Sequence, residues 1–144
     1  MPEYVPLSRR SSGEAEVLHP GVPPHLEPPL TEWMSDYQSH EILREAALKA
    51  EVSYAPTRTN HVVYRMEALM KGIRAASDPH KAYLDIVDGI LFIRSHDADT
   101  ETYERARKES KALAMEAAES LQKILRLGGS LWRVEGDHLE APRR

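Results

Sequence analysis

The sequence predicts a mainly α-helical protein, a bundle of four to five helices preceded by an extended proline-rich arm and followed by a short β-hairpin. Seven of the ten prolines lie within the first 30 residues. From residue 30 to residue 127 apolar residues recur at the spacing of amphipathic helices, and beyond residue 128 they alternate as in strands. We therefore predict an arm at 1–29, a helical bundle at 30–127, and a hairpin and tail at 128–144.

Composition narrows the class of protein. The 144 residues suffice for one domain, and 41% hydrophobic with 29% charged residues fits a globular chain. The formal net charge of −4 argues against a nucleic-acid partner, because dedicated nucleic-acid-binding domains are usually basic. Without cysteine there is no disulfide, thiolate or cysteine-zinc chemistry. We also expect no membrane partner and no export, since neither a long apolar run nor a secretory signal is readable.

The first predicted helix begins at residue 30, directly after Pro28 and Pro29, where a first helical turn tolerates missing N–H groups. A single apolar stripe at i, i+3, i+4 and i+7 supports it: Leu30, Trp33, Met34 and Tyr37. A second helical segment follows, with Ser39 as its N-cap. It could continue the first helix with a bend, and Pro56 closes it.

The next two helices have clear start signals. Thr59 or Asn60 can cap the third helix. Its core positions are Val62, Met66, Leu69, Met70 and Ile73. Asp78-Pro79 then starts a new helix, because a carboxylate N-cap satisfies free amides and proline suits the first turn. This helix, Pro79 to about Arg94, is apolar around most of its circumference and is expected at the centre of the bundle.

The stretch SHDADT at 95–100 is interpreted as a turn, followed by a long helix from about Glu101 to Leu127. Its predicted apolar stripe is Tyr103, Ala106, Ser110, Leu113, Ala117, Leu121 and Ile124. Gly128 and Gly129 end the helix as a C-cap pair. The acidic residues at 97–101 precede or begin this helix, where the positive end of the helix dipole stabilises negative charge.

The tail predicts a β-hairpin of residues 130–134 against 138–142, with a turn at 135–137. Alternation places Trp132 and Val134 on one face of this hairpin. Because an isolated hairpin is only marginally stable in water, it must pack on the helices or join the strands of a neighbour. Trp132, its one large side chain, is the predicted anchor.

The N-terminal segment is interpreted as a docking arm for a protein partner. Prolines restrict the unbound chain, which lowers the entropy lost when the segment is ordered on a surface. Extended proline-rich segments also leave backbone groups free to bond another protein. Two arginines against four glutamates make the arm acidic, which does not suit nucleic acid. The predicted partner-binding residues are Leu7, Val17, Leu18, Val22 and Leu26 of the arm, together with Trp132 of the tail.

Metal-site patterns are incomplete. His40-Glu41 begins like an HExxH zinc motif, but Arg44 stands where the second histidine is needed. Asp97-Ala-Asp99-Thr-Glu101 resembles the opening of a calcium loop, but Thr102 and Lys108 occupy the positions that require glycine and glutamate. We therefore predict no metal and no cofactor.

Two charged groups have more than one interpretation. Asp85 and Asp88, three residues apart on the most apolar helix, could be paired carboxylates for acid–base chemistry. They could equally mark the solvent edge of that helix or pair with a neighbouring arginine. Arg58, His61 and Arg65 share one helical stripe that could meet RNA phosphates or an acidic protein, or simply face solvent.

One motif resembles that of a known enzyme family. Arg74-AASDP-His80 is similar to the Arg-(x4–6)-His motif of HEPN ribonucleases, which are small helical bundles of abortive-infection and toxin systems. The resemblance implies that Arg74 and His80 act together on the RNA 2′-hydroxyl and phosphate, usually across a dimer. It touches these two residues alone.

A broader resemblance covers most of the body and tail. The proline-led L..W helix and the later pattern L..IL..GGS.WRV.GD.LE look like uncharacterised small helical proteins of bacteriophages, prophages and defence loci. We therefore predict a non-enzymatic structural or assembly protein, a component of a homo-oligomer or a phage virion that docks through its N-terminal arm, located in the virion or the bacterial cytoplasm. Two alternatives stay open: a HEPN-like metal-independent ribonuclease, and an adaptor that binds a host protein.

Overall fold

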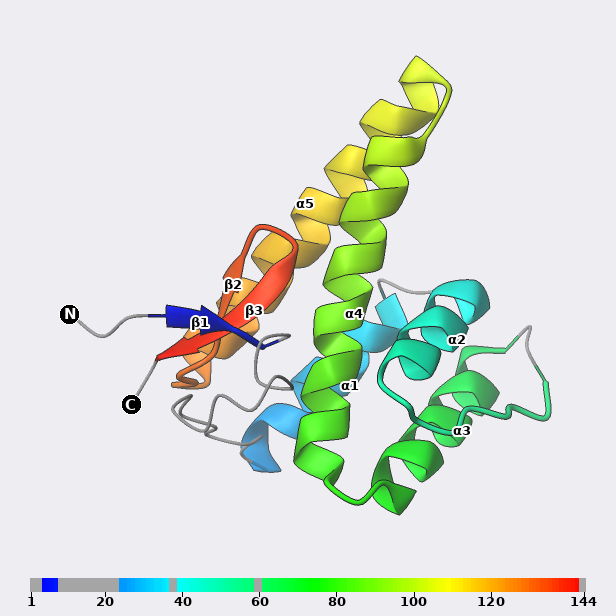
Figure 1. The fold of residues 1–144 in the computed structure, drawn as a ribbon, viewed down its shortest axis with the longest axis vertical. Helices are drawn as coiled ribbons and strands as arrows, with labels where there is room; N and C mark the ends of the chain where they lie inside the picture. Colours follow the sequence, from blue (N-terminus) through cyan, green and yellow to red (C-terminus); the bar gives the residue numbers. More distant parts are fainter. Residues whose placement is uncertain (1–3, 8–23, 37–38, 59–60, 143–144) are drawn as a thin grey trace.

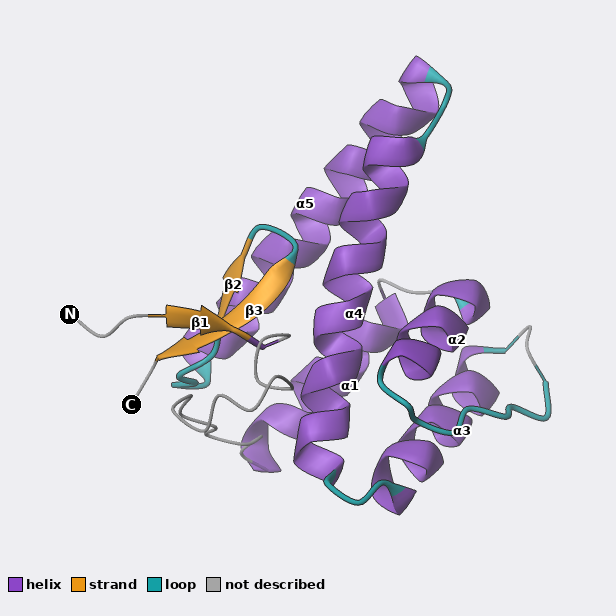
Figure 2. Ribbon diagram, in the orientation of Figure 1, coloured by secondary structure: helices purple, strands orange, loops and turns teal. Residues whose placement is uncertain are grey.

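The structure is a computed structural model that describes residues 4–7, 24–36, 39–58 and 61–142. It confirms the predicted fold class: five α-helices form the bulk of the protein, and an antiparallel hairpin follows them near the C-terminus (Figure 1). The hairpin is part of a small sheet that lies beside the helices (Figure 2).

The first two helices lie close to their predicted positions. A short 3-10 turn, Pro24–Leu26, leads into α1 (Glu27–Asp36), so the helix begins two residues before the predicted end of the arm at residue 29. Both prolines fall in its first turn, where no N–H is required. α2 (His40–Lys49) is a separate helix, and the Ser39 hydroxyl accepts the N–H of Ile42 at 3.4 Å, as predicted for an N-cap.

The fourth helix confirms the predicted centre of the bundle, whereas Val62, a predicted core position of the third helix, is 41% exposed. α3 (Val62–Ala75) has His61 at its N-cap position, and the predicted caps at 59–60 lie outside the described residues. α4 (Pro79–Thr100) starts at Asp78, whose carboxylate accepts the Lys81 N–H at 3.1 Å. α4 contacts α2, α3, α5 and the sheet, which makes it the central element.

The turn predicted at 95–100 is wrong, because α4 continues as a helix to Thr100. The polar residues of this stretch face outward while Ala98 is buried. Pairing with α5 (Glu104–Leu127) therefore overrides the weak helix propensity of the local sequence. α5 ends as predicted at Gly128, and Gly129 adopts a φ of +69° that glycine tolerates.

The sheet has three antiparallel strands in the order β1-β3-β2 (Figure 2). β2 (Arg133–Glu135) and β3 (His138–Pro142) form the predicted hairpin, with Val134 opposite Leu139. The neighbour that this hairpin needs comes from the same chain: β1 (Tyr4–Pro6) pairs with β3, and Pro6 lies opposite Glu140. The first and third predicted segments thus meet in one sheet.

One core joins these elements. The Trp33 indole N–H of α1 donates to the Ala117 carbonyl of α5 at 2.9 Å in a buried position. The Tyr83 hydroxyl of α4 hydrogen-bonds with the Thr31 hydroxyl at 2.8 Å and donates to the Glu27 carbonyl at 3.2 Å. Burial is the main reason why the pKa of Tyr83 is raised. α1 is therefore fixed to both long helices.

The C-terminal end of α4 and the N-terminal half of α5 extend beyond the rest of the molecule as an antiparallel helix pair (Figure 1). Along the whole stretch from Arg94 to Glu116, Ala98 is the one buried residue. We name residues 94–116 the helical arm. Its two helices cover each other on one side and are open to solvent on the others.

Candidate functional site

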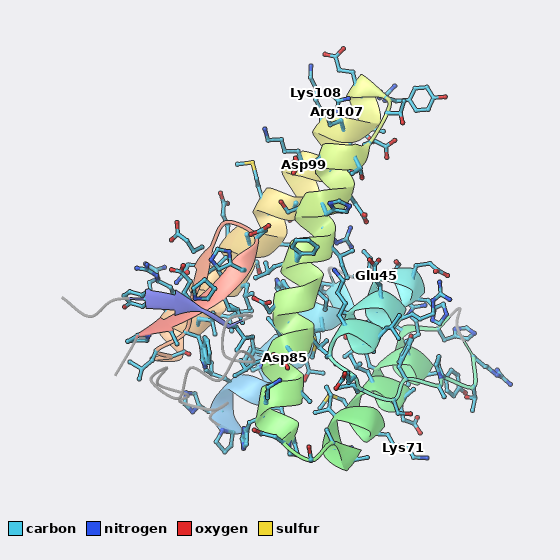
Figure 3. The ribbon with its side chains drawn as sticks, in the orientation of Figure 1. Glu45, Lys71, Asp85, Asp99, Arg107 and Lys108 are labelled. Carbon is cyan, nitrogen blue, oxygen red and sulfur yellow. The ribbon has the colours of Figure 1, made fainter. Side chains whose placement is uncertain are left out.

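The helical arm carries an open groove between α4 and α5, with a volume of about 450 Å³. Small side chains form much of its floor, including Ala98, Ala114 and Ala118. Charged side chains stand at its edges, among them Asp99 of α4 (Figure 3), Lys111 and Glu119. Because alanine fills little of the space between two helices, a trough remains where larger residues would have closed the contact.

Met115 stands beside this groove with 55% of its surface exposed. At the base of the arm, Val134 and Gly136 of the hairpin close one end of the groove. An apolar floor inside a charged rim is the arrangement of a protein-protein interface. Methionine suits such a surface, because its flexible side chain adapts to the shape of a partner.

A second cavity, of about 700 Å³, lies between α4, the end of α2, the end of β1 and the β2–β3 turn. Its lining mixes cationic and acidic groups. Lys81 forms an ion pair of 2.7 Å with Asp85 (labelled in Figure 3), and Asp88 and His138 also line the cavity. The two aspartates therefore have different environments: Asp85 pairs with a cation of its own helix, and Asp88 contacts the sheet.

Asp88 accepts a backbone N–H of β3 that no strand pairs with. The Leu139 N–H points toward the β1 side of β3, but β1 ends opposite Glu140. An Asp88 carboxylate oxygen accepts this N–H at 2.7 Å. On the other edge, the Gln122 amide oxygen of α5 accepts the Val134 N–H at 2.7 Å. Since an unpaired buried N–H is costly, these two side chains fasten the hairpin to α4 and α5.

The charges around β3 influence one another. Burial raises the pKa of Asp88 to about 6, although the hydrogen bond from Leu139 and the nearby His138 work against the shift. Burial alone would lower the pKa of His138, but hydrogen bonds to Asp137 at 3.0 Å and Glu140 at 3.1 Å raise it overall. Burial would raise the pKa of Glu140, but hydrogen bonds from His138 and Arg133 lower it overall.

We predict from these shifts that the protein is most stable at about pH 4 to 4.5 and loses stability toward pH 8. Asp88 binds its proton more tightly when folded, so stability falls as pH rises from 3.8 to about 6. The stabilisation from protonated His138 is complete below pH 6.5 and is lost as pH rises through its higher folded pKa. The stabilisation from ionised Glu140 is lost as pH falls from 4.5 through its lower folded pKa.

Thermal unfolding across this pH range measures the effect, and Asp88→Asn is the matched variant because its amide oxygen still accepts the Leu139 N–H. The part of the slope between pH 3.8 and about 6, worth about 3 kcal/mol, should disappear in this variant. Equal slopes in the two proteins would contradict the assignment to Asp88.

Of the six predicted partner-binding residues, the three that the structure describes are buried in the chain itself. Leu7, Leu26 and Trp132 are 2%, 3% and 2% exposed and belong to the chain's own core. Leu26 packs against the end of α5 so closely that a Cβ on Gly128 would lie 2.1 Å from a Leu26 methyl group. This corrects the prediction for these three residues: they bury apolar surface within the chain. The other three, at positions 17, 18 and 22, lie outside the described residues.

The residues of the ribonuclease resemblance lie on either side of one turn. Arg74 is in the last turn of α3 and His80 in the first turn of α4, and both are exposed. The predicted basic stripe is organised around Tyr64: Arg58 lies 5.4 Å from the centre of its ring, and the His61 ring meets it edge-on at 6.0 Å. Arg65 is half-buried.

The described residues also bear on membrane and metal sites. No helix there is long and apolar enough to cross a membrane. Nor do three histidine, aspartate or glutamate side chains gather as metal ligands would.

Sequence reasoning missed the groove and Met115. The apolar stripe predicted for α5 leaves out Met115, and two members of that stripe, Tyr103 and Leu113, are themselves 75% and 37% exposed. The signal that could have found it is an apolar residue between charged neighbours four positions away on either side. Comparison with known proteins adds no further residue: no protein family, curated protein or solved structure matches this chain.

Proposed function

We propose that this protein is a non-enzymatic assembly protein that self-associates through its helical arm, as a homo-oligomer or within a larger particle. The observation that carries the proposal is the arm itself: residues 94–116 hold one buried side chain and border an open groove with an exposed methionine. Because Leu7 and Leu26 lie in the core, we place the docking surface on the helical arm rather than on these two residues.

A pair of helices covers only part of the surface of each. Amphipathic helices gain most of their stability from tertiary packing, and bundles of three or four helices bury more apolar surface than two. Full burial of a methionine side chain is worth roughly 1.5–3 kcal/mol. Association of the arm with another helical surface would therefore stabilise both the contact and the arm.

The setting of this assembly follows from the sequence resemblance. The sequence pattern of the body and tail resembles that of small helical proteins of bacteriophages, prophages and defence loci. We propose a phage virion, or a phage-derived assembly in the bacterial cytoplasm, as the place where the protein works. This part of the proposal rests on that resemblance.

Sedimentation equilibrium of the full chain tests the function. The expected result is an average mass above that of the monomer, increasing with concentration. Met115→Asp should shift the equilibrium toward monomer by placing a charge beside the groove. Leu48→Asp is the matched control, because Leu48 is also exposed, at 77%, but lies on α2.

Strict monomers up to roughly 1 mM, where even an association of about 4 kcal/mol is detectable, would overturn the proposed function. A monomer that binds one host protein in equal stoichiometry would instead be the predicted adaptor. If neither substitution changes self-association, the protein still assembles, but the helical arm is not the surface through which it does so.

A further inference from the structure

The groove edge formed by α5 has a charge pattern that is complementary to itself. Lys111, Met115 and Glu119 are spaced four residues apart, so they lie one above another on the same face of α5. All three border the groove, and the cation and the anion are exposed on either side of the exposed methionine. Within the described ranges, neither Lys111 nor Glu119 has an ion-pair partner.

A two-fold axis at Met115, perpendicular to α5, generates a second, antiparallel α5. In this arrangement the charged side chains of one helix face side chains of opposite charge on the other. Position 111 then lies opposite position 119, and the methionine lies opposite its own copy. A two-fold interface between identical chains has this property, because each contact occurs twice. The same rotation places Ala112 opposite Ala118, and these small side chains let two helices approach closely.

We infer that a second copy of this chain docks on this face, with the two α5 helices antiparallel and the two-fold axis at Met115. The two methionines pack together over the alanine floor of the grooves. Lys111 of each copy pairs with the partner's Glu119 on either side. The inference rests on the proposed function and adds the identity of the partner and the register of the contact.

The geometry favours a second copy over an unrelated helix. Eight residues at 1.5 Å each separate the two charges by about 12 Å along the helix axis. A partner must present an anion and a cation at the same separation in the reverse order, with an apolar side chain between them. α5 itself meets this requirement. Because Val134 and Gly136 close the lower end of the groove, the helices cross at an angle and meet over about one turn on each side of Met115.

Charge reversal tests this register. Lys111→Glu places glutamate opposite glutamate twice in a homodimer, and Glu119→Lys places lysine opposite lysine twice. Each variant alone should self-associate at least about tenfold more weakly than the original chain at low ionic strength. Mixed together, the two variants form a heterodimer in which both contacts are again of opposite sign. Mixing should therefore restore association, as should combining both changes in one chain.

Three further experiments accompany the charge-reversal experiment. Arg44→Glu and Glu41→Lys make the same charge changes on α2, where both side chains are exposed, and should leave association unchanged. Circular dichroism should show equal helix content in all variants. Because the chain has no cysteine, Met115→Cys introduces a single thiol, which should form an intermolecular disulfide on oxidation, whereas Leu48→Cys should not.

The outcomes separate the two proposals. If the original chain associates but Lys111→Glu and Glu119→Lys associate equally well, the two-fold contact at Met115 is wrong and the assembly function stands. If the single variants are weakened and their mixture does not recover, the two residues meet some other surface and the inference is again overturned. If the original chain is a strict monomer, the proposed function fails with it.

Discussion

Replacing Trp132 with alanine is expected to lower the free energy of unfolding by about 3–5 kcal/mol, by the same amount at every protein concentration. The indole is 2% exposed and packs in the core of its own chain, directly before β2. Its loss leaves a cavity where the sheet meets the helices, and the surrounding side chains can fill it only in part. Since the contact is intramolecular, association does not change its contribution.

Denaturant unfolding at two widely separated protein concentrations measures this effect. Leu131→Ala is the control, because the neighbouring side chain is 49% exposed and its truncation should cost little. If the loss from Trp132→Ala disappears in the dissociated monomer, the hairpin is held by a neighbouring subunit and the intramolecular assignment is wrong.

Gly72→Ala is expected to destabilise the protein by about 3 kcal/mol, although alanine in a helix normally gains about 1 kcal/mol over glycine. Gly72 is a buried residue of α3. A Cβ at this position would lie 1.8 Å from the Ser53 carbonyl oxygen and 2.9 Å from the Ser53 carbonyl carbon. Because these are backbone atoms, the connection between α2 and α3 would have to move away from α3.

Gly89→Ala on α4 is the matched comparison. There the nearest atom to a new Cβ is the Ala46 Cβ at 3.4 Å, which is close to ordinary van der Waals contact. This variant should be neutral or slightly stabilising in the same unfolding measurement. Equal effects at the two glycines would show that close backbone approach is not what requires glycine at position 72.

Helix boundaries set by local chemistry were predictable from the sequence. Ser39 and Asp78 cap α2 and α4 as expected, and Gly128 ends α5. Each signal acts through hydrogen bonds or dihedral angles within a few residues, so it works without knowledge of the rest of the fold. The central position of α4 was also predictable, because a helix that is apolar around most of its circumference must be covered by neighbours.

Features that join distant segments were not predictable in this way. The sequence shows that Leu7 and Leu26 are apolar and that the hairpin needs a neighbour. It does not show whether a partner or the chain itself covers them. Likewise, periodicity could not show that Asp88 accepts the N–H of Leu139, 51 residues away. The candidate groove arises only where α4, α5 and the hairpin come together.

The sequence by itself determined that the chain forms these helices and this hairpin in this order, together with the caps of α2 and α4 and the end of α5. The tertiary structure decided that β1 completes the sheet within the same chain, that α4 extends to Thr100, and that Met115 faces solvent beside a groove. The reason is that local signals depend on neighbouring residues, whereas burial depends on which of several apolar surfaces meets another, and hydrophobic contact has no preferred direction or partner.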